Sequence, residues 1–255
     1  MLRVFFPTLV EVRQPDTLVT LQGEELRYLM LARRSRVGDA CELFDGAGLV
    51  AAATIAAIAP ARAELRAAPP RHVPALRPRL IVLQSLIKGE RMDVCLEKLV
   101  ETGADEIWLI DTERAVVKLP PDKSAARQGR WAAQALAAAR QSERAYLPTI
   151  DGPFELAEAI ARVPAGAARC ATDPAGAPWP LAPLATSSPQ AGDATPPAAA
   201  AALAIAIGPE GGFSPQEYAR LHAAGFASHA ISPHVLRAET AGPIAVALAR
   251  ATWRQ

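Results

Sequence analysis

The sequence of 255 residues predicts an α/β fold preceded by a small, mainly β domain. In the first 70 residues, short apolar runs are separated by turn signals such as Asp45-Gly46, a pattern typical of β-hairpins. From residue 79 onward, apolar runs of strand length alternate with helical patterns, which indicates parallel pairing. Because the proline-rich stretch Ala67–Pro78 separates the two patterns, we expect domains at 1–70 and 79–255, joined by a linker at 71–78.

In the N-terminal domain, we expect strands at Leu2–Phe6, Ala40–Phe44 and Leu49–Ile58 and a helix over Glu24–Arg33. These are short elements between turn residues, so the domain is predicted to be a compact β structure.

In the C-terminal domain, apolar runs predict strands at Leu80–Ser85, Ile107–Ile110, Cys170–Thr172 and Leu203–Ile207, and a further short strand is expected to end at Ala230–Ser232. Helices are expected around Met92–Val100, where Gly103 should form the C-cap, and at Ser124–Arg144 and Ile244–Trp253. Residues 174–198 contain mostly Pro, Ala, Ser, Thr and Gly, and we expect a flexible insert there because little large apolar surface offsets the ordering entropy.

Charge and composition exclude several classes of protein. The formal net charge of +1 argues against a globally basic nucleic-acid binder. Cys41, Cys95 and Cys170 are scattered and no Cys or His spacing suits a metal, so we expect no metal and a reducing, cytoplasmic location. The apolar run 198–207 is far shorter than the roughly 18 residues of a membrane span, so no membrane association is expected.

The stretch IGPEGGFSPQE, residues 207–217, places three glycines after a buried strand. A phosphate-binding loop would need a lysine after its last glycine, and none follows Gly212. The carboxylate of Glu210 would also repel a phosphate. Gly208, Gly211 and Gly212 still allow the backbone to approach a ligand closely, so we expect a binding loop for a ligand without phosphates.

The residues after these glycines have the form of a helix start. Ser214 and Glu217 are spaced as a capping box, with Pro215 at the first helical position. A plain strand–turn–helix connection would explain these residues without any ligand, but it would not explain Glu210.

A second loop, PHVLRAETAGP, lies before the last helix and gathers Arg237, Glu239 and Thr240. Glu239 and Thr240 could simply cap that helix. Two such loops after the last two strands nevertheless favour a shared site.

The pair IGPEGGFSPQE and VLRAETA resembles the signature of the SPOUT superfamily of methyltransferases, and within it the bacterial 16S ribosomal RNA uracil-N3 methyltransferase family. The blocks KGERMDVCLEKLVETGADEI, ERAVVK and ARQSERAYLPTI resemble further parts of that family in the same order. The N-terminal part resembles the family more loosely, through RVFF and VGD.

The resemblance implies a SPOUT-type parallel sheet with a C-terminal trefoil knot, a PUA-like β-barrel at the N-terminus and a homodimer. It also implies that S-adenosylmethionine binds between the knotted loops, with Leu236 against the adenine. The residues that would then bind the cofactor are Thr172, Asp173, Ile207, Gly208, Gly211, Gly212, Ile231, Ser232, Leu236, Arg237, Ala238 and Thr240.

Methylating N3 of uracil requires loss of an imide proton, and negative charge develops on the uracil oxygens. Arg237 is the candidate for stabilising that charge. Either Glu239 or Glu210 is the candidate base or substrate-orienting group, and the sequence does not decide between them.

The implied partner is 16S ribosomal RNA or the small ribosomal subunit. Candidate contacts to its backbone are the basic residues Arg27, Arg33, Arg34, Arg36, Lys88, Arg91, Arg114, Lys118, Arg140 and Arg144. Two alternatives stay open: the same scaffold acting on another ribosomal or transfer RNA position, and a non-catalytic RNA-binding or ribosome-assembly protein.

Overall fold

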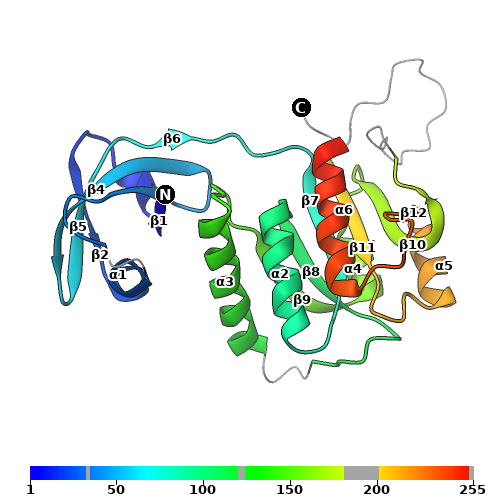
Figure 1. The fold of residues 1–255 in the computed structure, drawn as a ribbon. Coiled ribbons are helices and arrows are strands. Elements are labelled where there is room, and N and C mark those ends of the chain that lie inside the picture. The colour runs from blue at the N-terminus through cyan, green and yellow to red at the C-terminus, as the bar shows by residue number, and fades with distance from the viewer. Residues whose placement is uncertain (33–34, 120–123, 181–200, 253–255) are drawn as a thin grey trace, which may run out of the picture. The chain divides into compact units, whose positions relative to one another are not determined.

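The computed structural model describes residues 1–32, 35–119, 124–180 and 201–252 and divides the chain into two compact units (Figure 1). Unit 1 contains Met1–Ala75 together with Ala139–Leu147, and unit 2 contains Leu76–Ala138 together with Pro148–Gln255. Residues 139–147 therefore belong to unit 1, although the expected domains at 1–70 and 79–255 would place them in the C-terminal domain.

Unit 1 is a six-stranded, mainly antiparallel sheet in the order β1-β3-β4-β5-β2, with β6 paired to β4. Only β1 and β3 pair in parallel. The elements are β1 (Leu2–Phe5), η1 (Leu9–Glu11), β2 (Thr17–Leu21), α1 (Gly23–Arg27), the π-helical turn η2 (Tyr28–Ala32), β3 (Ala40–Phe44), β4 (Leu49–Ala59), β5 (Arg62–Ala67) and β6 (Arg71–His72). The prediction of a small β domain is thus confirmed, whereas β2 and β5 were not predicted.

Alternating side chains build the core of unit 1. Along β3, Cys41 and Leu43 are buried, and they pack with residues such as Val19, Ile55 and Leu65 from the neighbouring strands. The predicted turn at Asp45 is present, because its carboxylate accepts the backbone N–H groups of residues 47 and 49. β6, at the start of the predicted linker 71–78, pairs with β4.

Arg3 holds the segment 139–147 within unit 1. Its side chain is 2% exposed, pairs with Glu42 at 2.8 Å, and donates to the carbonyls of Ala139 and Arg144 at 3.3 and 2.9 Å. The guanidinium of Arg140 in turn pairs with Glu25 and lies 4.2 Å above the ring of Tyr28. Burial raises the pKa of Glu25, and the neighbouring Arg140 charge opposes that rise.

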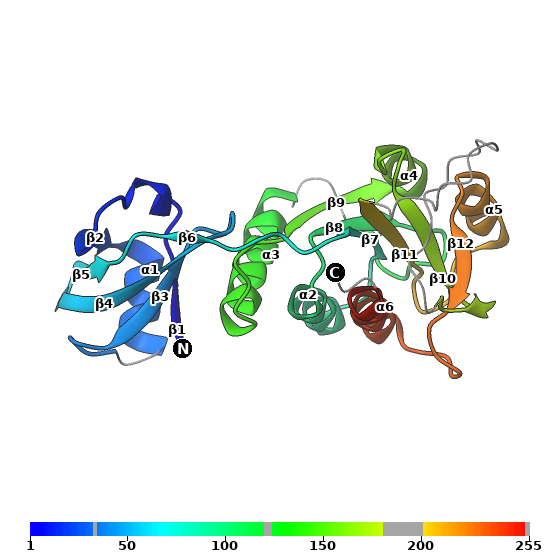
Figure 2. The ribbon, with the colours of Figure 1, turned by 90° about the horizontal axis from the view of Figure 1, so that it is seen from above.

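Unit 2 contains a six-stranded sheet in the order β12-β10-β11-β7-β8-β9, with every neighbouring pair parallel. Figure 2 shows α4 and α5 on one face of this sheet and α2 and α6 on the other. The elements are β7 (Arg79–Ser85), α2 (Glu90–Thr102), β8 (Glu106–Asp111), α3 (Ser124–Gln141), β9 (Thr149–Glu155), α4 (Leu156–Arg162), β10 (Ala168–Pro178), β11 (Ala202–Ile207), α5 (Pro215–Ala223), β12 (Ala227–Ala230) and α6 (Ala238–Thr252). The prediction of a parallel α/β domain is confirmed, whereas the trefoil knot stays a prediction.

The central strands of unit 2 are buried on both faces. Residues 80–85 of β7 and 202–207 of β11 are all buried, which explains the apolar runs in both, with Gln84 and Ser85 as buried polar residues at the end of β7. α2 buries one apolar stripe and ends at Gly103, whose left-handed φ of 107° confirms the predicted C-cap. Within that stripe, burial and the nearby charge of Glu239 raise the pKa of the Cys95 thiol to about 12.

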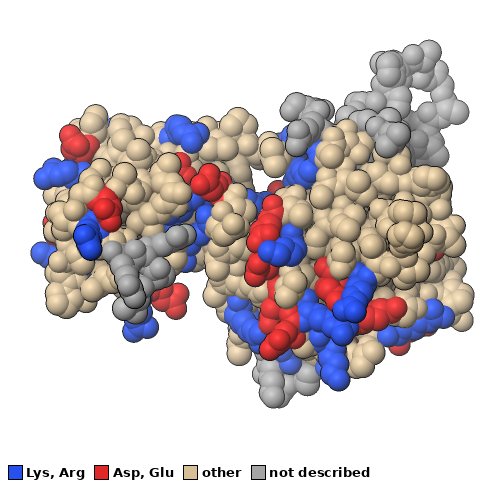
Figure 3. Space-filling view, viewed as in Figure 1, with Lys and Arg blue, Asp and Glu red and all other residues tan. Residues whose placement is uncertain are grey.

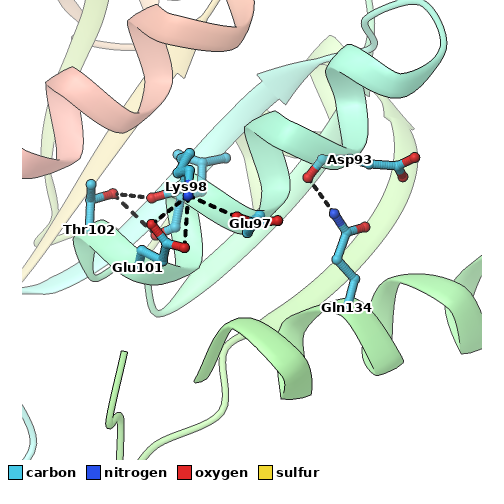
Figure 4. A network of polar contacts seen from close by, with 7 residues as sticks. Asp93, Glu97, Lys98, Glu101, Thr102 and Gln134 are labelled. Carbon is cyan, nitrogen blue, oxygen red and sulfur yellow. Dashed lines mark hydrogen bonds and ion pairs between the residues drawn. The ribbon is translucent and has the colours of Figure 1, made fainter. Parts of the chain in front are cut away.

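The outer side of α2 carries a network of polar contacts (Figure 4). The ammonium of Lys98 contacts the carboxylates of Glu97 and Glu101 at 2.8 and 2.9 Å, which raises the pKa of Lys98 and lowers that of Glu97. Gln134 of α3 donates to the backbone carbonyl of Asp93. The ion pairs of Lys98 lie within α2 and, being exposed, contribute little to the stability of the fold, whereas the contact of Gln134 with Asp93 joins α2 to α3.

The structure corrects the start of the predicted insert. Residues 174–178 continue β10 and pair with β12 after a shift in register, and Trp179 is buried. A Cβ at Gly176 would lie 2.7 Å from the backbone of Ser228 and His229, so glycine allows this close pairing. The prediction of a flexible segment is therefore wrong for 174–178, and residues 181–198 of the insert lie outside the described residues.

No helix within the described residues is long and apolar enough to cross a membrane.

Candidate functional site

A cleft opens in unit 2 at the ends of β11 and β12, beside residues 172–174 of β10. Three segments line it: Thr172–Pro174 within β10, residues 207–212 after β11, and residues 231–241 around the start of α6. Ligands bind at this edge in open parallel sheets because loops from neighbouring strands converge there. The lining residues are Thr172, Asp173, Pro174, Ile207, Gly208, Pro209, Glu210, Gly212, Tyr218, Ile231, Ser232, His234, Val235, Leu236, Ala238 and Ala241.

Most of the residues that the resemblance assigned to the cofactor lie together in this lining. Three do not: Gly211, Arg237 and Thr240 are absent from it. Gly211 packs instead against the side-chain stem of Arg114. Arg237 accepts, through its backbone carbonyl, the N–H groups of Thr240 and Ala241 in the first turn of α6.

The glycines after β11 are required mainly by the turn they form. The backbone N–H of Gly212 donates to the carbonyl of Pro209 at 2.8 Å. Gly212 has a φ of 66°, which favours glycine, and a Cβ at Gly208 would lie 3.1 Å from the backbone nitrogen of Phe213. This tight turn places Glu210 at its tip and along the cleft.

The predicted capping box of α5 is present. Ser214 Oγ accepts the backbone N–H of Glu217 at 3.2 Å, and Glu217 Oε2 accepts the N–H of Ser214 at 2.7 Å. Glu217 does more than cap the helix, because its Oε1 also accepts the backbone N–H of Glu113 at 2.8 Å. This carboxylate, 2% exposed, therefore ties the end of β8 to the glycine turn.

Tyr218 is a lining residue that the sequence did not reveal. Its hydroxyl donates to the carbonyl of Thr172 at 3.2 Å, and its ring lies edge-on to Phe213 with centroids 5.5 Å apart. Burial, followed by the charge of Asp173, raises the pKa of the phenol to about 12, so it stays a neutral donor at physiological pH. Tyr218 joins two walls of the cleft, and no spacing in the sequence marks a tyrosine of α5 for that role.

Two glutamates and two arginines form a charged cluster beside the cleft. Arg91 lies 3.9 Å from an oxygen of Glu210 through Nη1 and 3.9 Å from Glu239 Oε1 through Nε. Arg237 Nη1 also lies 3.9 Å from Glu239 Oε1. The structure thus brings together the three residues predicted for chemistry and adds Arg91, which the sequence had suggested only as an RNA contact.

The two glutamates differ in their surroundings. Glu210 lines the cleft and its side chain is 33% exposed. Glu239 is 13% exposed, and its buried Oε2 has no hydrogen-bond partner among the residues that the structure describes. A group entering the cleft can therefore reach the carboxylate of Glu210 more readily than that of Glu239.

The basic residues suggested as RNA contacts have varied environments. Arg27, Arg36 and Lys88 are exposed, whereas Arg140 is 13% exposed and holds Glu25 within unit 1. Lys118 pairs with Asp111 at 3.2 Å. The remaining residues of that set are Arg91 and Arg114 beside the cleft, Arg144 in segment 139–147, and Arg33 and Arg34, which lie outside the described residues.

The surface charge of unit 2 is mixed: Figure 3 shows blue and red side chains interspersed over this face of the unit. Among the residues with described positions, no group of three or more His, Cys, Asp or Glu is arranged to hold a metal ion.

The chain matches two family models. Residues 75–250 match an RNA methyltransferase domain, and residues 21–67 match an RNA methyltransferase PUA domain. The first match covers unit 2 almost entirely, and the second lies inside unit 1.

Curated relatives resemble the chain over most of its length. It is 32% identical to ribosomal RNA small subunit methyltransferase E of Mycobacterium tuberculosis, over 91% of this chain and 86% of that protein. It is 28% identical to the protein of the same name from Synechocystis, over 91% of this chain and 72% of that protein.

Solved structures share the fold. A ribosomal RNA small subunit methyltransferase E from Neisseria gonorrhoeae, bound to S-adenosyl methionine, has a TM-score of 0.81 and 27% identity, covering 99% of this chain and 98% of that one. A Legionella pneumophila protein, in complex with the bound cofactor SAM, also has a TM-score of 0.81, with 26% identity, covering 98% of this chain and 97% of that one.

These matches confirm the predicted enzyme class and the PUA-like N-terminal domain. The chain belongs to the RNA methyltransferase family in which this methyltransferase domain follows a PUA domain.

Proposed function

We propose that this chain transfers a methyl group from S-adenosylmethionine to N3 of one specific uridine in the 16S ribosomal RNA of the small ribosomal subunit. The RNA methyltransferase family supports the reaction class. The names of the curated relatives support the small-subunit substrate, and the bound ligand of the Neisseria gonorrhoeae structure supports the cofactor.

The charge of the cleft lining is the observation that carries the cofactor assignment. Within the described part of the chain, the lining includes the carboxylates of Asp173 and Glu210 and no lysine or arginine. A polyphosphate would be repelled by such a cleft, whereas a ligand with a positive sulfonium and no phosphate suits it. Ile207, Ile231 and Leu236 add apolar surface for an adenine ring.

Backbone groups and these side chains would hold the cofactor between the three loops. When bound, S-adenosylmethionine supplies the methyl group from a positively charged sulfur. The remaining task of the chain is to place a uracil N3 in line with that methyl group and to stabilise the charge that develops on the uracil.

We assign the proton-accepting or substrate-orienting role to Glu210, because it is the glutamate of the charged cluster that lines the cleft. Glu239 is the carboxylate shared by Arg91 and Arg237, so its role is to orient those two side chains. The Arg237 guanidinium is 77% exposed between the lining residues Leu236 and Ala238, where it can meet the oxygens of an entering uracil.

A labelling experiment tests the proposed reaction. The protein is incubated with methyl-labelled S-adenosylmethionine and small subunits that lack the modification, with free 16S RNA in parallel. We expect label at a single uridine, read as a reverse-transcription stop because a methyl group on N3 blocks base pairing. Label at another ribosomal or transfer RNA position would support the first alternative, and absence of cofactor binding by calorimetry would support a non-catalytic scaffold.

We further propose that unit 1 contributes to RNA binding and that Arg27, Arg36 and Lys88 contact the RNA backbone. We also propose that the enzyme acts in the cytoplasm as a homodimer and that its cofactor-binding loops are knotted. The PUA match and the exposure of these side chains support the RNA contacts, and the resemblance to SPOUT enzymes supports the dimer and the knot. Sedimentation equilibrium should give twice the mass of one chain, and the mass of a single chain would contradict the dimer.

A further inference from the structure

Arg114 is an exposed residue whose guanidinium contacts the backbone of the glycine turn. Its Nη1 donates to the carbonyl of Gly211 at 2.9 Å and to that of Phe213 at 3.3 Å. Its side-chain stem covers Gly211, since a Cβ built on that glycine would lie 3.4 Å from Arg114 Cβ. One guanidinium nitrogen thus bridges two carbonyls of the turn that carries Glu210.

The backbone next to Arg114 is fixed independently. The N–H of Glu113 donates to the buried Glu217 carboxylate, which also holds the N–H of Ser214. The turn is therefore joined to the segment after β8 at two points, once through a side chain of that segment and once through its backbone.

The glycine turn needs such support for a physical reason. Gly211 and Gly212 have no side chains that could pack and limit their own backbone freedom, and glycine loses more conformational entropy on ordering than any other residue. A guanidinium that bridges two carbonyls restricts the turn without filling the cleft. Arginine suits this position better than lysine because its planar, multi-donor head keeps a fixed geometry.

We propose that Arg114 is a positioning residue of the cofactor cleft, which holds the turn 208–213 in its binding conformation, and not a contact to the RNA backbone. The inference rests on the proposed function, because it assumes that S-adenosylmethionine is the ligand of the cleft. It reassigns a residue that the sequence grouped with the RNA-binding arginines.

The two roles predict different measurements. Arg114→Gln removes the charge and the two-carbonyl bridge, and we expect the Kd for S-adenosylmethionine to rise roughly tenfold, as for loss of a charged hydrogen bond. The salt dependence of RNA binding should stay unchanged. Arg114→Lys keeps the charge but not the planar terminal nitrogen that donates to both carbonyls, so it should restore little of the cofactor affinity.

The experiment measures the cofactor Kd by calorimetry and the affinity for a 16S RNA fragment over a range of salt concentrations, both well below the melting temperature of each variant. Arg220→Ala, an exposed arginine of α5, is the matched control and should match the wild type in both assays. An unchanged cofactor Kd with a salt slope reduced by about one would overturn the proposal and show a phosphate contact. If the wild-type protein itself binds no S-adenosylmethionine, it is the proposed function that fails.

Discussion

Replacing Arg237 with alanine should lower kcat for methyl transfer about 100- to 1000-fold, while the Kd for S-adenosylmethionine changes little. Negative charge appears on the uracil oxygens as the imide proton leaves, and removal of one group that stabilises such charge typically costs that much in rate. Arg237 is exposed beside the cleft and is not one of its lining residues, so its loss should spare cofactor binding. Single-turnover kinetics with saturating cofactor would measure the effect.

Two further variants separate the roles in the charged cluster. Glu210→Gln should also lower kcat by roughly 100-fold or more, the usual contribution of a general base. Glu239→Gln should cost less, and it should cost almost nothing further when added to Arg91→Ala and Arg237→Ala, because Glu239 acts through those arginines. A wild-type kcat in Arg237→Ala, or a larger loss from Glu239→Gln than from Glu210→Gln, would contradict these assignments.

Replacing Glu217 with alanine should destabilise the protein by about 2–4 kcal/mol. The substitution leaves the buried N–H of Ser214 and the partly buried N–H of Glu113 without their acceptor, and it removes half of the capping box. Urea denaturation followed by circular dichroism would measure the change in the free energy of unfolding.

The neighbouring residue Gln216 supplies a control for this substitution. It occupies the same first turn of α5 with an exposed side chain, so Gln216→Ala should change the unfolding free energy by less than about 0.5 kcal/mol. Equal losses in the two variants would show that the effect belongs to the helix start in general and not to the buried carboxylate of Glu217.

Local signals in the sequence predicted much of unit 2 correctly. The Ser214–Glu217 capping box and the Gly103 C-cap depend on contacts within a few residues, so they are readable from spacing alone. Strand β11 is apolar throughout and β7 is apolar over residues 80–83 because both faces of these strands are covered, which also leaves a clear local pattern.

Features that depend on distant contacts were missed. The β10 extension 174–178 contains proline, glycine and alanine and reads as coil, but pairing with β12 makes it a strand. The sequence suggested Arg140 and Arg91 as RNA contacts. In the structure, Arg140 pairs with Glu25 in unit 1. Arg91 lies between Glu210 and Glu239. Such ion pairs join residues far apart in the chain, and the residue types alone do not identify the partner.

Because Ala139–Leu147 belongs to unit 1, neither unit corresponds to one continuous stretch of the chain. The chain passes between the units after residues 75, 138 and 147, so no single cut separates them. A fragment that ends at residue 75 would leave Arg3 without the carbonyls of Ala139 and Arg144 and Glu25 without Arg140. A recombinant that kept residues 139–147 but received an N-terminal segment without Arg3 and Glu25 would lose the same contacts, so unit 1 depends on both stretches of the chain.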